Sequence, residues 1–214
     1  MFVYAFDVDG VLTPIRSSWQ FVKRALGIDS RFDKYAQLFF DGFIAYDEWV
    51  WLELRFLKGV SLETFKRILG SIPWRHGIEK LAEFRRSRPR DIFVAITGGF
   101  ALLCERAVKE LGFDACIGAE VEVSNGRLTG FARNYIDFHG KGTALRDFIE
   151  ERGLKPAKVI CVGDNINDLD MFKQCDVSIA FCPSEMVGKS HVDVYIPSCS
   201  IGKLVEALKT VSEL

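Results

Sequence analysis

Residues 2–10 read Phe-Val-Tyr-Ala-Phe-Asp-Val-Asp-Gly, an apolar run that ends abruptly in two carboxylates and a glycine. Five apolar residues without alternation predict a strand that is covered on both faces, as in a parallel sheet flanked by helices. Ligands bind at the carboxyl ends of such strands, where Asp7 and Asp9 lie. Side chains two residues apart in an extended chain point the same way, and two desolvated carboxylates repel each other unless a cation or a shared proton relieves them. The pair therefore predicts a metal ion, an acid/base pair, or both.

The composition is that of an ordinary globular protein, with 214 residues, 49% apolar and 27% charged. This length suits one large domain or a domain with a sizeable insertion. The net charge of −1 provides no long-range field that would favour nucleic acid or an anionic membrane. No apolar segment approaches the roughly 20 residues that span a bilayer, and a basic signal-peptide region is absent. We therefore expect a cytoplasmic monomer or homodimer that binds neither nucleic acid nor membrane.

The cysteines show no CxxC spacing and mostly lie in apolar surroundings. They are Cys104, Cys116, Cys161, Cys175, Cys182 and Cys199. We expect all six to be reduced thiols in the core, without zinc or disulfide roles.

Residues 15–74 have the apolar periodicity of four short amphipathic helices and are rich in aromatic side chains. No strand pattern interrupts them, so this block is predicted to be a helical cap inserted after the first strand. Its aromatic stripes are expected to form mainly a local core, although one or two rings could close over a ligand. Residues 1–14 and 75–214 would then form the core domain.

After the cap, apolar strands alternate with helices. Strands are expected at 91–96, 158–162, 177–181 and 192–196, and a hairpin with an Asn-Gly turn at 119–130. This rhythm predicts an α/β fold with a doubly wound, Rossmann-like parallel sheet, whose edge the hairpin decorates.

Three of the predicted strands end in polar clusters. Asp7 and Asp9 follow the first, Thr97-Gly98-Gly99 the second, and the third runs into Gly163-Asp164-Asn165-Ile166-Asn167-Asp168, while Lys141 begins a helix between the last two. In a parallel sheet these ends lie on one edge. DxDG, a strand-end threonine, a lysine and GDxxND, in that order, resemble the four motifs of the haloacid dehalogenase superfamily of aspartate-nucleophile phosphatases.

The resemblance implies that Asp7 is the nucleophile, which forms an aspartyl phosphate, and that Asp9 is the general acid and base. Hydrolysis of phosphate monoesters needs up to ~10²¹-fold acceleration, so a nucleophile, an acid and charge neutralisation must act together. Magnesium prefers hard oxygen ligands, which Asp7, the carbonyl of Asp9, and Asp164 would supply. We therefore expect Mg²⁺ as the cofactor.

The remaining motif residues are expected to bind phosphate or to orient the site. Thr97 and the backbone of Gly98 and Gly99 would cradle phosphate oxygens. Lys141 would act in catalysis by neutralising the phosphate and the nucleophile. Asn167 is expected at the phosphate, and Asp168 is expected to orient the groups around it.

Beyond these motifs, the cap and the segments around 97–100 and 125–130 resemble the phosphoserine phosphatase branch. Two positions depart from that branch: Arg16 stands where an acidic residue grips the substrate ammonium, and Glu53 where an arginine binds the carboxylate. Arg55 lies close enough to replace that arginine. A misplaced charge against a buried ammonium is costly, so Arg16, Glu53 and Arg55 are expected to contact the substrate and phosphoserine is disfavoured as that substrate.

The sequence thus predicts a Mg²⁺-dependent phosphomonoesterase for a small phosphorylated metabolite, similar to phosphoserine phosphatase but with altered substrate-binding residues. A phosphotransferase or phosphomutase of the same fold is the nearest alternative. A catalytically idle protein that binds a phosphorylated ligand is a third.

Overall fold

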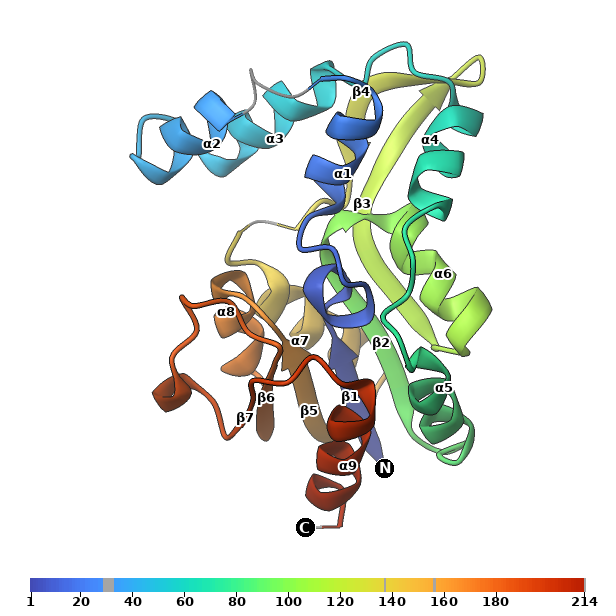
Figure 1. Ribbon diagram of the computed structural model, residues 1–214, viewed down its shortest axis with the longest axis vertical. Helices are drawn as coiled ribbons and strands as arrows, with labels where there is room; N and C mark the ends of the chain where they lie inside the picture. The colour runs from blue at the N-terminus through green and yellow to red at the C-terminus, as the bar shows by residue number, and fades with distance from the viewer. Residues whose placement is uncertain (29–32, 137, 156, 214) are drawn as a thin grey trace.

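The computed structural model describes residues 1–28, 33–136, 138–155 and 157–213. Strand β1 (Phe2–Phe6) is central in a sheet with the order β4-β3-β2-β1-β5-β6-β7 (Figure 1). The other strands are β2 (Ile92–Phe100), β3 (Ala115–Ser124), β4 (Arg127–Arg133), β5 (Lys158–Gly163), β6 (Val177–Phe181) and β7 (Val194–Ile196). All neighbouring pairs are parallel except β3 and β4.

Helices cover both faces of the sheet, which confirms the doubly wound α/β fold. Tyr4 and Phe6 belong to one apolar cluster, with α5 (Ile78–Arg86), α6 (Ala101–Leu111) and α9 (Ile201–Val211). Val3 and Ala5 belong to a second, with α7 (Lys141–Glu151) and α8 (Leu169–Phe172). Because side chains alternate along a strand, the unbroken apolar run of β1 supplies both cores.

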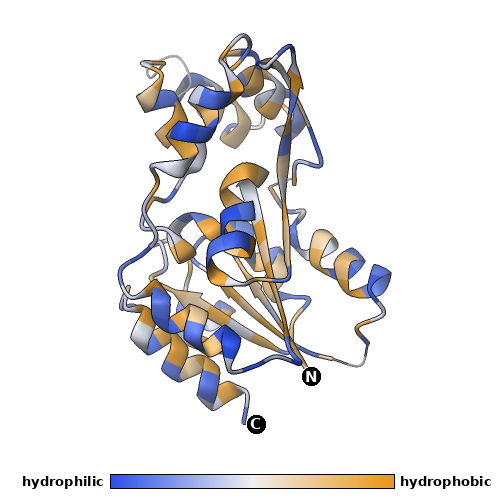
Figure 2. Cartoon of the chain, turned by 90° about the vertical axis from the view of Figure 1, so that its right-hand side faces the viewer, coloured by the Kyte–Doolittle hydropathy of each residue, from blue (hydrophilic) through white to orange (hydrophobic). Residues whose placement is uncertain are grey.

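Four helices of the cap follow β1: α1 (Ser18–Ala25), α2 (Asp33–Phe40), α3 (Tyr46–Arg55) and α4 (Leu62–Gly70). They lie beyond the carboxyl ends of the strands, and α2 and α3 project to one side (Figure 1). Hydrophobic and hydrophilic residues both recur along their ribbons (Figure 2), as expected for amphipathic helices. Residues 29–32 of the predicted cap lie outside the described residues, and the domain boundaries at 14 and 75 stay predictions.

The β3–β4 hairpin, predicted at the sheet edge, also supports the cap. The amides of Gly59 and Leu62 donate to the carbonyls of Leu128 and Gly126, each at 2.9 Å. Strand β2 continues beyond the expected end at 96, because Phe100 still pairs with Ala119 across a register shift. Within the described residues, no helix has both the length and the apolar character needed to cross a bilayer.

Candidate active site

Asp7 follows β1 directly and meets the side chain of Lys141 at the first turn of α7. The Lys141 Nζ lies 2.9 Å from Asp7 Oδ1 and 2.6 Å from Asp168 Oδ1, and all three side chains are buried. Burial raises the pKa of Asp7, and the charge of Asp168 raises it further, while Lys141 opposes both. Burial acts against the ammonium of Lys141, but Asp168 and Asp7 outweigh it and raise the pKa of Lys141. The lysine therefore stays charged and holds the nucleophile candidate in place.

Asp168 is fixed from its other side by the loop that follows β5. Its Oδ2 accepts the amides of Asp164 at 2.8 Å and Asn165 at 3.0 Å. Gly163 lets the loop pack this tightly, since a Cβ on it would lie 2.4 Å from the Asp168 carboxyl carbon. Asp168 thus connects Lys141 with the backbone of Asp164, and the orienting role remains a prediction.

Asp7, Asp164 and Asp168 form a cluster in which one carboxylate oxygen of each lies within 4.8 Å of the others. Burial, followed by the charge of Asp168, raises the pKa of Asp164 to about 7. Lys141 and Arg16 bring two positive charges to these three carboxylates, which leaves one negative charge unbalanced, and the hard oxygens of Asp7 and Asp164 suit Mg²⁺. The donor set therefore fits the predicted metal ion.

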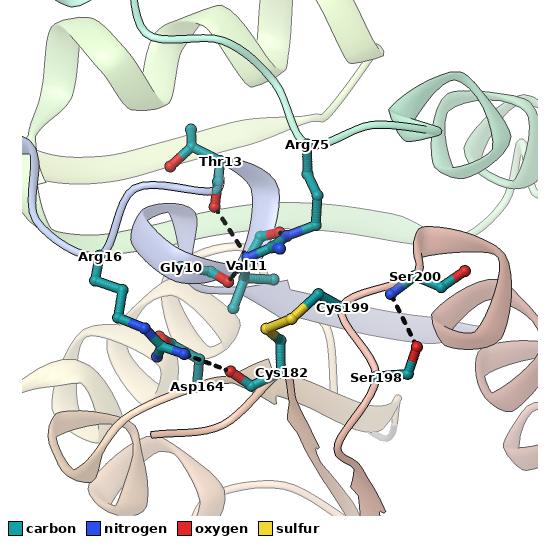
Figure 3. The surroundings of a disulfide bond; sticks show 10 residues. All are labelled: Gly10, Val11, Thr13, Arg16, Arg75, Asp164, Cys182, Ser198, Cys199 and Ser200. Carbon is teal, nitrogen blue, oxygen red and sulfur yellow. Dashed lines mark hydrogen bonds and ion pairs between the residues drawn. A yellow bond between two sulfur atoms is a disulfide. The ribbon is translucent and has the colours of Figure 1, made fainter. Parts of the chain in front are cut away.

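Gly10 allows Asp164 to approach the turn after β1. Its φ of +79° is a left-handed conformation, and a Cβ there would lie 2.2 Å from Asp164 Oδ2. Arg16 approaches the same carboxylate from the solvent side, with Nη1 2.6 Å from Oδ2 and Nη2 donating to the carbonyl of Cys182 at 3.0 Å (Figure 3). Arg16, predicted as a substrate contact, therefore lies at the cavity while paired with Asp164.

Arg75, which the sequence did not single out, braces the turn that carries Asp9. Its buried guanidinium donates to the carbonyls of Gly10, Val11 and Thr13 (Figure 3). Its own amide donates to the carbonyl of Leu12 at 2.8 Å. Arg75, the first residue after the predicted cap, thus binds the four consecutive carbonyls of residues 10–13, in the turn next to the nucleophile candidate.

The two oxygens of Asp9 have different surroundings. Oδ2 accepts two hydrogen bonds from Ser18, at 2.6 Å from the amide and 2.7 Å from the hydroxyl. Oδ1 is shielded from solvent, and no described group makes a hydrogen bond to it. Burial raises the pKa of Asp9, and the bonds from Ser18 partly oppose this. One free oxygen with an elevated pKa suits a group that gives and takes a proton.

Thr97, Gly98 and Gly99 lie near the carboxyl end of β2, and Gly99 approaches the Asp9 carboxylate. The amide of Gly99 donates to Thr97 Oγ1 at 2.9 Å, and a Cβ on Gly99 would lie 2.3 Å from Ser18 Oγ. The indole of Trp19 donates to the carbonyl of Gly98 at 3.0 Å. Ser18 and Trp19 were not predicted as site residues. Ser17, which precedes a helical apolar pattern, is a helix-start signal that could have placed both in the first turn of α1.

A single cavity of about 380 Å³ connects this strand edge with the cap. It brings together most of the predicted site residues: Asp7, Asp9, Arg16, Glu53, Thr97, Gly98, Gly99, Asp164 and Asn167. Lys141 and Asp168 do not line it and lie behind Asp7. One end of the cavity is therefore formed by the predicted catalytic groups and the other end by residues of the cap.

Glu53 and Arg55, both predicted as substrate contacts, have different positions. Glu53 lines the cavity, where it pairs with Lys23 at 2.8 Å and accepts from the Trp49 indole at 3.1 Å. Arg55 is exposed and does not line the cavity, and its guanidinium lies 4.6 Å from the ring centre of Trp51. The structure therefore does not bring Arg55 together with the other predicted contacts, because residues two apart on a helix face different directions.

The expectation that all cysteines are reduced is wrong for one pair. Cys182, after β6, and Cys199, before α9, form a disulfide beside Arg16 and Arg75 (Figure 3). The other four are free thiols. The two partners are 17 residues apart and have no spacing pattern, so only the return of the chain from β7 brings them together.

Comparison with known proteins agrees with this architecture. Residues 4–173 match the family described as haloacid dehalogenase-like hydrolase. A phosphoserine phosphatase of Archaeoglobus fulgidus is 30% identical over 97% of this chain, which spans only 60% of that relative's length. One of Campylobacter jejuni subsp. doylei is 32% identical over 73% of each chain. A solved structure titled as a phospho-aspartyl intermediate analogue of phosphoserine phosphatase has a TM-score of 0.80 at 22% identity, covering 96% of this chain and 97% of that one, and so shares the fold.

Proposed function

This chain belongs to the haloacid dehalogenase-like hydrolase family, and we propose that it is a Mg²⁺-dependent phosphomonoesterase for a small phosphorylated metabolite. One observation carries the proposal. The same cavity exposes Asp7, held by Lys141 at 2.9 Å, and Asp9, which keeps one oxygen free. A nucleophile and a proton donor, two residues apart after β1, thus line the same cavity.

In the proposed reaction, an oxygen of Asp7 attacks the phosphorus and the bond to the leaving oxygen breaks. The proton on Asp9 Oδ1 passes to that oxygen, so the product leaves as an alcohol. Asp9, now ionised, then takes a proton from a water molecule that attacks the phosphorus. Phosphate leaves and the Asp7 carboxylate is restored.

The other site residues bind and orient these groups. Ser18 keeps Asp9 Oδ2 engaged, so that Oδ1 remains for proton transfer. Lys141, which lies behind Asp7, holds that carboxylate and offsets its negative charge as the phosphoryl group approaches. Asp7, the carbonyl of Asp9, and Asp164 would hold Mg²⁺, which neutralises phosphate charge when it is bound. Thr97 and Asn167 are proposed to contact the phosphate.

The relatives named phosphoserine phosphatase suggest phosphoserine as a first substrate to test, but the residues around the cavity argue for a different one. Arg16 stands where the phosphoserine phosphatase branch has the acid that holds the substrate ammonium, and the pair Lys23–Glu53 is already engaged within the cap. Phosphoserine is therefore expected to be a poor substrate.

Phosphate release from a panel of monoesters, with Mg²⁺ and with chelator, tests the proposal. Wild type should release phosphate in proportion to substrate loss, while Asp7→Asn should be slower by at least about 10⁴-fold, as for a lost nucleophile. Phosphate transferred to an added alcohol acceptor would instead indicate a phosphotransferase. No turnover of any ester, with Asp7→Asn altering only binding, would indicate a binding protein.

A further inference from the structure

The cap end of the cavity is aromatic. Phe40 at the end of α2, Tyr46 and Trp49 on α3, and Phe138 before α7 all line it. We call these four residues the aromatic wall. Three of them come from the cap and one from the core, so the wall closes the cavity across the junction between them.

The rings of the wall contact one another closely. The ring centres of Phe40 lie 6.0 Å from those of both Trp49 and Phe138, and Tyr46 lies 5.8 Å from Trp49. Phe39 packs behind them, 5.1 Å from Trp49 in a stacked arrangement. Side chains held in this way form a preformed apolar surface, which needs little reorganisation to receive a ring.

The charged groups at this end are engaged with each other. Lys23 and Glu53 form an ion pair at 2.8 Å, with only 12% and 5% of their side chains exposed. The Trp49 indole N–H also donates to Glu53. Its polar group is therefore already satisfied and does not require a hydrogen-bond acceptor on the substrate. Separating this pair to receive an ammonium or a carboxylate would leave a buried charge without its partner, which is unfavourable.

We infer that the preferred substrate is a phosphomonoester whose alcohol carries a neutral aromatic ring or a comparably bulky apolar group. The inference rests on the proposed phosphomonoesterase function and names its substrate class. The phosphoryl group would lie at Asp7 and Thr97, and the ring against the aromatic wall. The cavity of about 380 Å³ is within the range of small-molecule sites and accommodates both parts.

The test compares 2-phenylethyl phosphate with ethyl phosphate. Both are esters of primary alkyl alcohols, so the ratio of their kcat/KM values reports binding of the ring rather than a better leaving group. Wild type should favour 2-phenylethyl phosphate by about 10- to 100-fold, the range expected for burying a phenyl ring. It should also favour this ester over O-phosphoserine and phosphocholine.

Variants test whether the aromatic wall causes this preference for 2-phenylethyl phosphate. Trp49→Ala should lower the ratio at least about 10-fold, since it removes the largest ring of the wall. Trp51→Ala is the matched control, because Trp51 lies on the same helix but is 44% exposed, stacks with Arg55 and does not line the cavity. It should leave the ratio unchanged within about twofold, as surface substitutions generally do. Should Trp49→Ala fail to fold, Phe40→Ser, at a position 59% exposed, should still lower the ratio.

The outcomes separate this inference from the function on which it rests. If no ester releases phosphate, the proposed phosphomonoesterase function itself fails. If ethyl phosphate is hydrolysed but the ratio is near one, or if phosphoserine or phosphocholine is preferred, only the inference is overturned. An equal effect of Trp49→Ala and Trp51→Ala on the ratio also overturns it.

Discussion

Arg16 Nη1 lies 2.6 Å from Asp164 Oδ2, so a cation of the protein itself already contacts a carboxylate proposed to bind Mg²⁺ (Figure 3). Two cations that share one carboxylate compete for it. The Arg16 side chain is 49% exposed, so solvent screens part of this attraction.

The first prediction is that Arg16→Gln strengthens Mg²⁺ binding about 2- to 5-fold, a range that corresponds to a weak, partly exposed ion pair. Titration of the substrate-free protein with Mg²⁺ in a calorimeter measures this directly. Arg55→Gln removes the same charge from an exposed position outside the cavity and should have no effect. Weaker binding by Arg16→Gln would show that Arg16 orients Asp164 for the metal instead of competing with it.

The second prediction concerns the pH dependence of stability in metal-free protein. The pKa of Asp164 is about 7 when folded, against ~3.9 in an unfolded chain, so the folded state binds this proton more tightly. The resulting stabilisation is complete below about pH 4 and is lost as pH rises through 7. Between pH 5 and 8, wild type should lose about 2–3 kcal/mol of unfolding free energy from this group, which Asp164→Asn cannot lose. Urea unfolding with chelator measures both, and parallel pH profiles would contradict the prediction.

The third prediction is that Arg75 positions the turn after β1. Arg75→Met should lower the free energy of unfolding by about 2–4 kcal/mol, because it leaves buried carbonyls without a donor. It should also lower kcat more than it raises KM, since the turn carries Asp9 and adjoins Asp7. Arg75→Lys, which keeps a donor, should restore part of both. Normal kcat in a destabilised Arg75→Met protein would assign this arginine to stability alone.

The fourth prediction is that the disulfide stabilises the connection between β6 and α9. It closes a loop of 17 residues, for which chain entropy gives about 3 kcal/mol. Cys199→Ser should therefore unfold at lower urea concentration than oxidised wild type. With reductant present the two proteins should unfold alike, and a difference that persists there would mean that the serine itself disturbs the packing.

Much of the fold, and the part of the site at the carboxyl ends of the strands, could be predicted from the sequence, because each motif residue follows a buried strand or begins a helix. Asp7, Asp9, Thr97 and Asp164 all end apolar runs, and a parallel sheet brings such ends to one edge. Lys141 begins α7 and is aligned with this edge by the packing of that helix on the sheet. Local patterns therefore sufficed for these residues.

The contacts that other segments of the chain make with these residues could not be predicted in the same way. Ser18 and Trp19 reach the ends of β1 and β2 only because the cap folds back over them, and Arg75 reaches the turn after β1 from a distant part of the chain. These contacts join residues up to 79 positions apart. The pairing of Glu53 with Lys23 depends on how α3 packs against α1, which apolar periodicity does not specify. The disulfide likewise depends on tertiary structure, with no sequence spacing to indicate it.

The central claim is that Asp7, and not Asp9, carries the phosphoryl group during turnover. An acyl phosphate is reduced by borohydride, which converts the modified aspartate to homoserine. Protein quenched with borohydride during turnover of a good substrate with Mg²⁺ should carry homoserine at position 7, identified by mass spectrometry of the N-terminal peptide, and none in Asp7→Asn. Homoserine at position 9, or unmodified peptide from protein that is turning over substrate, would contradict the account.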